Sequence, residues 1–205
     1  MNILIPCNWL KDYLKTKAAP QKIADCLSLC GPSVEKIDKI KNDFVFDIEV
    51  TTNRVDMMSI SGIARETAAI LPQFGIKAKL KKDPYKKPMV NGQRSMVKKI
   101  KELEVAIKDN SLCPRFSAVV LENVKVKPSP KKIRQRLKKA GMRSLNNVVD
   151  VSNILMHELG QPVHIFDYDK IGKHQMILRE AKKGEKITTL DGKTYKLPGG
   201  DIVIE

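Results

Sequence analysis

Polar side chains crowd the segment SLNNVVDVSNILMHELGQPVHIFDYDKI, residues 144–171, among valines, isoleucines and leucines that would otherwise predict a simple core helix. Each polar group that such a helix buried would need a hydrogen-bond partner, so this many polar groups are unusual in a core. The composition is typical of a pocket in which a few polar groups converge on a bound molecule. His164 could take part in that chemistry, although a lone histidine close to a proline, here Pro162, is more often structural.

A second polar cluster, Thr51, Asn53, Arg54 and Asp56, follows a predicted strand in IEVTTNRVDMMSISGIARE, residues 48–66. Asparagine and aspartate satisfy the backbone groups of a turn locally. The guanidinium of Arg54 could bind a carboxylate or a phosphate through two parallel hydrogen bonds. The pattern favours a hydrogen-bonded corner between a strand and a helix over a binding site.

Lysine and arginine total 38 against 23 aspartates and glutamates, which gives the chain a formal net charge of +15. Two windows carry all of this excess, because residues 77–108 have a net charge of +8 and residues 125–143 a net charge of +9. Such a concentrated basic surface is typical of proteins that bind a polyanion, most often RNA or DNA. The first window includes KLKKDPYKKPMVNGQR, whose prolines and glycine favour a connection between domains.

The second window predicts a helix with the apolar stripe Ile133, Leu137 and Ala140 and an otherwise basic surface. A solvated helix face and an RNA-binding face explain that surface equally well. The candidate RNA-binding residues are Lys131, Lys132, Arg134, Arg136, Lys138 and Lys139.

The four cysteines, Cys7, Cys26, Cys30 and Cys113, form neither a C-x-x-C pair nor the dense pattern of a disulfide framework. We therefore expect buried thiols, no metal site and a reducing compartment, most simply the cytoplasm. No run approaches the ~18 apolar residues of a membrane span. The N-terminus, MNILIPCNWLKDYL, lacks the basic and apolar regions of a signal peptide.

Hydrophobic periodicity predicts the elements that must position these residues. In the first part of the chain we expect a short helix capped by Asn8, a helix between Pro20 and Gly31, a strand over 44–50, and a helix from Ser59 or Ser61 to Leu71. Further on we expect a β-rich segment over 116–126, a helix capped by Ser129 that ends at Gly141, a helix over 148–159, a hairpin at Asp191-Gly192 and a strand from Asp201. Because the chain ends within that last strand, we expect it to be a piece of a longer protein.

These elements predict an α+β fold of two small mixed α/β units joined by a basic linker. The first unit spans residues 1–80, the linker 81–112 and the second unit 113–205.

Five segments, in order, resemble the N-terminal part of the beta subunit of bacterial-type phenylalanyl-tRNA synthetase. They are NWLKDYL, IEVTTNRVDMMSISGIARE, CPRFSAVVLENVKV, NNVVDVSNILMHELGQPVHIFD and TTLDGK. The chain differs from the family pattern at Thr52, Val55, Met57 and Ser152, where proline, proline, cysteine and threonine are common. An inserted RNA-binding module that most members carry after the position of Ile40 is missing, because Lys41-Asn42-Asp43 leads directly into the next strand.

The resemblance implies that the parent enzyme is a class II ligase that joins phenylalanine to tRNA(Phe) and needs ATP and magnesium. It implies an alpha subunit as partner, in a heterotetramer, and places the aminoacylation site there and not in this chain. No cofactor is expected in this fragment, and no membrane. Residues 113–205 resemble the first part of the module that hydrolyses Tyr-tRNA(Phe), since a pocket built for phenylalanine rejects an added hydroxyl poorly.

The resemblance assigns the editing pocket to Ser152, Asn153 and His164. His164 would position the ester or the attacking water, and Ser152 and Asn153 would hydrogen-bond the substrate or that water. The family's acidic residue that recognises the tyrosine hydroxyl corresponds to a position after Glu205, so we expect an incomplete module with little or no hydrolysis by this chain alone. A free-standing editing hydrolase and a non-enzymatic basic RNA-binding module are the alternatives.

Overall fold

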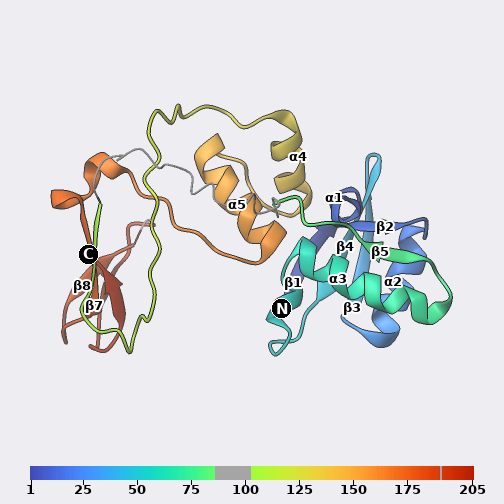
Figure 1. The fold of residues 1–205 in the computed structure, drawn as a ribbon, viewed down its shortest axis with the longest axis horizontal. Coiled ribbons are helices and arrows are strands. Elements are labelled where there is room, and N and C mark those ends of the chain that lie inside the picture. Colours follow the sequence, from blue (N-terminus) through green and yellow to red (C-terminus); the bar gives the residue numbers. More distant parts are fainter. Residues whose placement is uncertain (86–102, 190) are drawn as a thin grey trace, which may run out of the picture. The chain divides into compact units, whose positions relative to one another are not determined.

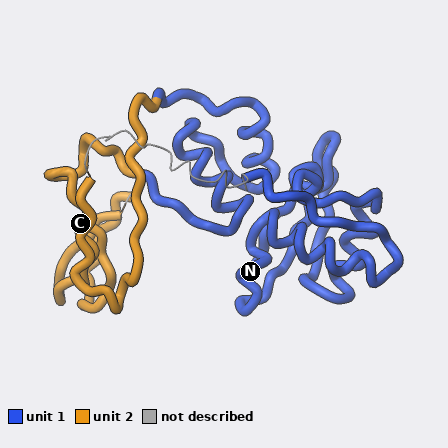
Figure 2. Tube along the Cα trace, viewed as in Figure 1, with its two compact units in different colours: residues 1–90, 125–165 blue, residues 91–124, 166–205 orange. Residues whose placement is uncertain are grey.

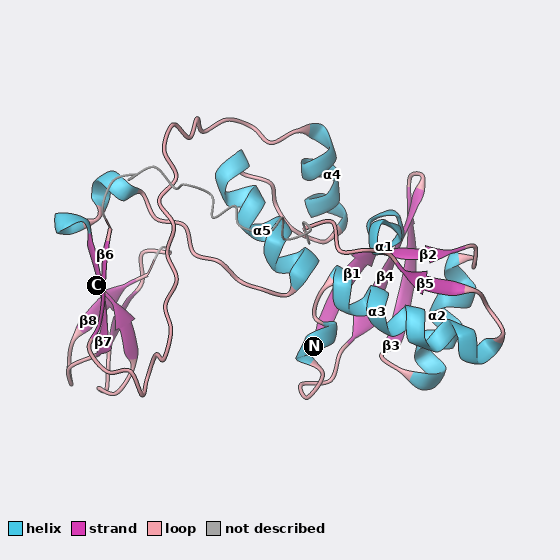
Figure 3. Ribbon diagram, in the orientation of Figure 1, coloured by secondary structure: helices cyan, strands magenta, loops and turns pink. Residues whose placement is uncertain are grey.

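A computed structural model describes residues 1–85, 103–189 and 191–205 (Figure 1). The chain forms two compact units, one of residues 1–90 with 125–165 and one of residues 91–124 with 166–205 (Figure 2). Helices and small sheets are mixed in the described chain, which confirms the predicted α+β class (Figure 3). Most of the predicted linker, 86–102, lies outside the described residues.

A three-stranded antiparallel sheet forms the centre of the first unit. Its middle strand β4 (Asp43–Glu49) pairs with β1 (Asn2–Pro6) and β3 (Ser33–Ile40), so Phe46 lies opposite both Ile5 and Ile37. Only Lys41 and Asn42 join β3 to β4, with Lys41 in the left-handed region at a φ of 55°. This hairpin confirms that the chain passes directly into the strand at Asp43.

Three helices pack on this sheet, namely α1 (Cys7–Tyr13), α2 (Pro20–Cys30) and α3 (Ile60–Ile70). The Ser59 hydroxyl accepts a hydrogen bond from the Gly62 N–H at 3.0 Å, so Ser59 is the cap of α3. Two short strands, β2 (Leu14–Thr16) and β5 (Ala78–Leu80), pair with each other, and 3₁₀ turns cover Val55–Met57 (η1) and Leu71–Phe74 (η2).

The predicted cap of α1 is wrong, because Asn8 lies inside the helix. Its N–H donates to the Asp43 carboxylate at 2.9 Å, and the helix begins after Pro6 without a side-chain cap of its own. A carboxylate from the neighbouring strand therefore satisfies a free N–H of the first turn, which local sequence alone does not reveal.

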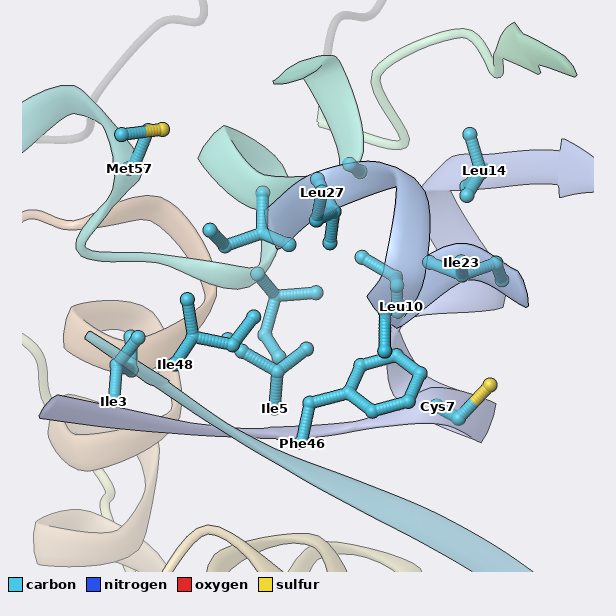
Figure 4. Close-up of a cluster of buried hydrophobic side chains, with 14 of the residues drawn as sticks. Ile3, Ile5, Cys7, Leu10, Leu14, Ile23, Leu27, Phe46, Ile48 and Met57 are labelled. Atoms are coloured by element: carbon cyan, nitrogen blue, oxygen red, sulfur yellow. The ribbon is translucent and has the colours of Figure 1, made fainter. Parts of the chain in front are cut away.

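Figure 4 shows the core between sheet and helices, where the Ile5, Leu10 and Phe46 side chains meet. Burying each such side chain contributes about 1.5–3 kcal/mol. The largest fully buried side chains of this core are Trp9, Phe46, Ile5, Leu10, Leu14, Ile23, Leu27, Ile48, Ile60, Ile63 and Leu71.

Two further helices, α4 (Lys131–Lys139) and α5 (Asn147–Leu159), belong to the same compact unit (Figures 1 and 2). Ala140, at the end of α4, is part of the core, and Ile154 of α5 packs against it. As predicted, Leu137 is buried, and Gly141 and Gly160 end the helices with φ values of 76° and 77°. Pro130 precedes α4 without a side-chain cap, so the predicted Ser129 cap is wrong.

The second unit contains a sheet in the order β10-β7-β6 and a separate hairpin. Strand β6 (Glu104–Ile107) runs parallel to β7 (Gln175–Glu180), and β10 (Ile202–Ile204) runs antiparallel to it. The predicted hairpin at Asp191-Gly192 is confirmed by β8 (Lys186–Thr188) and β9 (Thr194–Lys196), and the last predicted strand by β10. The unit also has two short 3₁₀ turns, Tyr168–Lys170 (η3) and Gly172–His174 (η4).

The predicted β-rich segment 116–126 forms no strand in the structure. Its Val119 and Leu121 side chains are 81% and 75% exposed. Strand propensity expresses packing against neighbouring strands, and no described strand pairs with this segment, so the composition alone does not produce a strand.

Candidate functional site

Two of the three predicted editing residues, Ser152 and Asn153, lie in the middle of α5, and the third, His164, follows the helix. Asn146 caps the helix by accepting hydrogen bonds from the N–H groups of Val148 and Val149, both at 3.0 Å. Ser152 and Asn153 are half-buried neighbours on the helix, and His164 lies in the exposed segment that follows Gly160. The Ser152 hydroxyl donates to the Val149 carbonyl at 2.7 Å, which leaves its oxygen lone pairs to accept a hydrogen bond.

A buried carboxylate fastens α5 to the first part of the chain. Glu158 accepts hydrogen bonds from the Trp9 indole N–H at 3.0 Å and from the Tyr85 hydroxyl at 2.8 Å. The next residue towards the N-terminus, His157, hydrogen-bonds the Leu4 carbonyl at 2.8 Å, and its ring lies 5.5 Å from that of Trp9. These contacts hold the helix that carries Ser152 against the core.

This polar interface shifts the pKa values of its members. Burial and the hydrogen bond to Glu158 raise the pKa of Tyr85 to about 12. Burial, reinforced by the charge of Glu158, also raises the pKa of Tyr13. Burial lowers the pKa of His157 in spite of its bond to the Leu4 carbonyl, so the imidazole is neutral at pH 7 and donates to that carbonyl.

A second buried carboxylate, Asp150, organises the turn between α4 and α5. It accepts hydrogen bonds from the Ser144 hydroxyl at 2.5 Å and the Leu145 N–H at 2.8 Å. Burial would raise the pKa of Asp150, but these hydrogen bonds and the charge of Arg134 lower it overall. The turn is therefore fixed by an anion that remains charged near neutral pH.

Two of the six predicted RNA-binding residues bind acids of the first part of the chain instead of facing solvent. Lys139 forms an ion pair of 2.7 Å with Asp43, whose side chain is only 2% exposed. Arg136 pairs with Asp12, and its guanidinium lies 5.1 Å from the centre of the Trp9 ring. These two cations anchor α4, and they separate it into an anchoring face and an outer face.

The other four predicted cations, Lys131, Lys132, Arg134 and Lys138, are all exposed. Lys132 lines the same cleft as Arg136 and Lys139, whereas Arg134 and Lys138 belong to the outer face. Two clefts adjoin α4, one of about 260 Å³ that includes Trp9 and the two ion pairs, and one of about 490 Å³ that includes Arg134, Lys138 and Arg143. Ser152, Asn153 and His164 line neither of them.

The cluster after β4 is a hydrogen-bonded corner. The Arg54 guanidinium donates hydrogen bonds to both carboxylate oxygens of Asp56, at 2.9 and 3.1 Å, and to Glu66 at 2.9 Å. The backbone N–H of Arg54 donates to the Thr51 carbonyl. The guanidinium of Arg54 holds the pKa of Asp56 at about 2. The Asn53 side chain is exposed.

A glycine explains why this corner packs so tightly on α3. A Cβ at Gly62 would lie 2.0 Å from the Asp56 carbonyl oxygen, so only glycine allows the close approach. Arg65, on the same helix as Gly62, donates a further hydrogen bond of 2.9 Å to the Asp56 carboxylate. The fork of Arg54 is occupied by carboxylates, as the structural interpretation of this motif expected.

Clusters of possible metal ligands are absent from the described residues. Within them, no three or more histidine, cysteine, aspartate or glutamate side chains gather closely enough to hold one. No helix in the described part of the chain combines the length and apolar character needed to cross a membrane.

Comparison with known proteins finds similarity both for residues 112–205 and for most of the chain. Residues 112–205 match the family described as B3/4 domain. The phenylalanine–tRNA ligase beta subunit of Carboxydothermus hydrogenoformans is 41% identical over 176 residues, which are 85% of this chain and 21% of that protein. The chain is a relative of the phenylalanine–tRNA ligase beta subunits. The beta subunit of Rhodopirellula baltica extends the similarity to 98% of the chain, at 36% identity over 202 residues, and the chain covers 28% of that protein.

The beta subunit of Thermotoga maritima is 42% identical over 163 residues, 80% of this chain and 19% of its own length. The chain therefore spans less than a third of the beta subunits it matches. The B3/4 segment includes α4 and α5, which the structure groups with residues 1–90. In this beta-subunit relative, the B3/4 segment thus contributes to both compact units.

Proposed function

We propose that this chain is the N-terminal region of a phenylalanine–tRNA ligase beta subunit and contributes there to tRNA(Phe) binding and to hydrolytic editing of Tyr-tRNA(Phe). The observation that carries the proposal is the similarity to beta subunits over 80–98% of the chain. The B3/4 match over 112–205 supports an editing role for the segment that contains Ser152, Asn153 and His164.

The editing step needs a site that holds the tyrosyl ester and directs water to it. His164, in the exposed segment after α5, positions the ester or the water, and the Ser152 and Asn153 side chains accept or donate hydrogen bonds to either. Anchoring of α5 through Glu158 and Trp9 supports this assignment, because it fixes the helix on which two of the three groups are carried.

In the complete enzyme, the partners of this region are the alpha subunit and tRNA(Phe), and the enzyme works in the cytoplasm. ATP and magnesium serve the ligation of phenylalanine at the alpha subunit. The reaction assigned to this region is ester hydrolysis, for which the proposed residues supply hydrogen bonds and a water-positioning imidazole.

The deacylation of preformed Tyr-tRNA(Phe) by the complete enzyme tests this proposal. We expect His164→Ala to slow the release of tyrosine by roughly 10²-fold or more, which is the scale on which a positioned acid–base group contributes. The rate of phenylalanine attachment should remain at the wild-type value, because that chemistry takes place elsewhere.

His174→Ala provides the matched control, since His174 is an exposed histidine of the second unit that stacks on Tyr168. It should leave both rates unchanged. Wild-type tyrosine release by His164→Ala would remove the editing role, and the basic RNA-binding module would then be the better description of this region.

A further inference from the structure

The two clefts beside α4 contain equal numbers of cations but differ in their acids. The smaller one, about 260 Å³, is lined by Lys132, Arg136 and Lys139 together with Asp12 and Asp43. Two of its three cations are paired with those carboxylates. This cleft is nearly neutral, and its charges hold α4 in place.

The larger cleft, about 490 Å³, has the opposite balance. Three cations, Arg134, Lys138 and Arg143, line it without any acid, and the rest of the lining is Pro128, Met142, Ser144 and Leu145. We call these seven residues the basic cleft. Within the described chain, the side chains of these three cations make no ion pair or hydrogen bond, although the buried Asp150 carboxylate attracts the charge of Arg134.

Contacts outside the lining of the basic cleft hold its walls in place. Arg136 and Lys139 tie α4 to Asp12 and Asp43, and Asp150 fixes Ser144 and Leu145 in the opposite wall. These contacts fix the backbone from which Arg134, Lys138 and Arg143 project, so the walls need no further ordering when a ligand binds. The three exposed cations give the cleft a positive charge that attracts a negatively charged ligand.

We propose that the basic cleft binds the ribose–phosphate backbone of tRNA. Arginine matches a phosphate with two parallel hydrogen bonds, so Arg134 and Arg143 suit phosphate groups, and Lys138 adds a point charge in the same lining. Leu145, 58% exposed, and Met142 offer apolar contact to a ribose or a base. The identity of the RNA rests on the proposed function, whereas the site rests on the cleft itself.

This proposal does not treat all the cations of α4 as RNA-binding residues. Arg136 and Lys139 belong to the anchor, and Arg143, beyond the end of α4, belongs to the site. The RNA contact therefore follows one side of α4 and the turn after it.

Binding of a fluorescently labelled tRNA(Phe) transcript to the 205-residue chain, over a series of salt concentrations, tests the assignment. The variant Arg134→Ala/Lys138→Ala/Arg143→Ala should weaken binding by roughly tenfold or more at low salt. The slope of log Kd against log salt should fall by about 2 to 3, close to one for each phosphate that the variant no longer neutralises.

The control variant Lys17→Ala/Lys22→Ala/Lys79→Ala removes three exposed lysines from the same unit, outside both clefts. It should keep the wild-type slope. Equal decreases in affinity in the two triple variants would overturn the proposal, because net charge alone would then explain the binding. Unchanged affinity in the basic-cleft variant would overturn it as well, provided that Trp9 fluorescence shows an intact first unit.

Phosphatidylserine vesicles offer lipid phosphates as the competing ligand. Vesicle binding that depends on the basic cleft, without an effect on tRNA, would contradict the assignment to RNA. Loss of tRNA binding in the basic-cleft variant alongside unaffected editing in His164→Ala would support the cleft and reject the editing role. The two proposals therefore fail separately.

Discussion

At the scale of single residues, buried polar groups decide how α5 meets the core. Glu158 accepts hydrogen bonds from the Trp9 indole N–H and the Tyr85 hydroxyl, and His157 donates one to the Leu4 carbonyl. None of these pairings follows from local sequence, because the partners are separated by 73 to 153 positions. A polar-rich helix was predictable from the sequence, but its buried partners were not.

His157 makes the stability of the first unit depend on pH. Because burial lowers its pKa in the folded state, the unfolded chain binds a proton near pH 6.5 that the folded chain resists. The free energy of unfolding should therefore be fully retained above pH 6.5 and should decline as the pH falls below it. Urea titrations followed by the fluorescence of the single tryptophan, Trp9, measure this decline.

His157→Gln keeps an N–H donor for the Leu4 carbonyl and removes the titrating ring. Its unfolding free energy should vary less than that of the wild type between about pH 6.5 and 5, above the usual range of carboxyl titration. His174→Gln, in the second unit, serves as the control and should follow the wild-type curve. A wild-type pH dependence in His157→Gln would contradict the role given to this residue.

At the scale of elements, the sequence predicted the helix α4 correctly but not which of its cations contact the rest of the unit. The apolar stripe with Leu137 and the stop at Gly141 predicted α4 well, because helix periodicity and left-handed glycine are local properties. Its cations looked equivalent in the sequence. The division into anchor and outer face depends on Asp12 and Asp43, which lie far away in the chain.

Strands were harder to predict than helices for a related reason. Segment 116–126 has strand composition but no described partner, whereas β1 and β3, where no strand was predicted, form strands because β4 pairs with both. Strand formation depends on pairing with distant segments, so composition alone is an incomplete guide. The editing residues Ser152, Asn153 and His164 came from family resemblance, and their role stays a prediction.

Adjacent lysines of α4 provide a test of the anchor. Lys139→Ala leaves the buried Asp43 without its counter-ion, although the N–H groups of Asn8 and Phe44 still bond it. We expect a loss of about 1–3 kcal/mol in the free energy of unfolding, measured by urea titration with Trp9 fluorescence. Lys138→Ala removes the same side chain from the outer face and should cost less than about 0.5 kcal/mol. Equal costs for the two variants would show that the ion pair contributes nothing.

At the scale of the whole molecule, the B3/4 segment and the first part of the chain are physically joined. Helices α4 and α5 come from the matched segment 112–205 and complete the unit built on residues 1–90. The basic cleft and the helix with Ser152 and Asn153 therefore belong to one compact unit. Within that unit, the anchoring of α4 and α5 places the residues proposed for RNA binding and for editing on the same core.

Ultraviolet cross-linking of tyrosylated tRNA(Phe) to the complete enzyme, followed by mass spectrometry, locates both proposed contacts in one measurement. We expect cross-links from internal tRNA nucleotides to peptides within residues 128–145 and from the aminoacylated end to peptides within residues 152–164. The variant Arg134→Ala/Lys138→Ala/Arg143→Ala should lose the first set. Cross-links confined to other parts of the beta subunit or to the alpha subunit would contradict both the RNA-binding and the editing assignment.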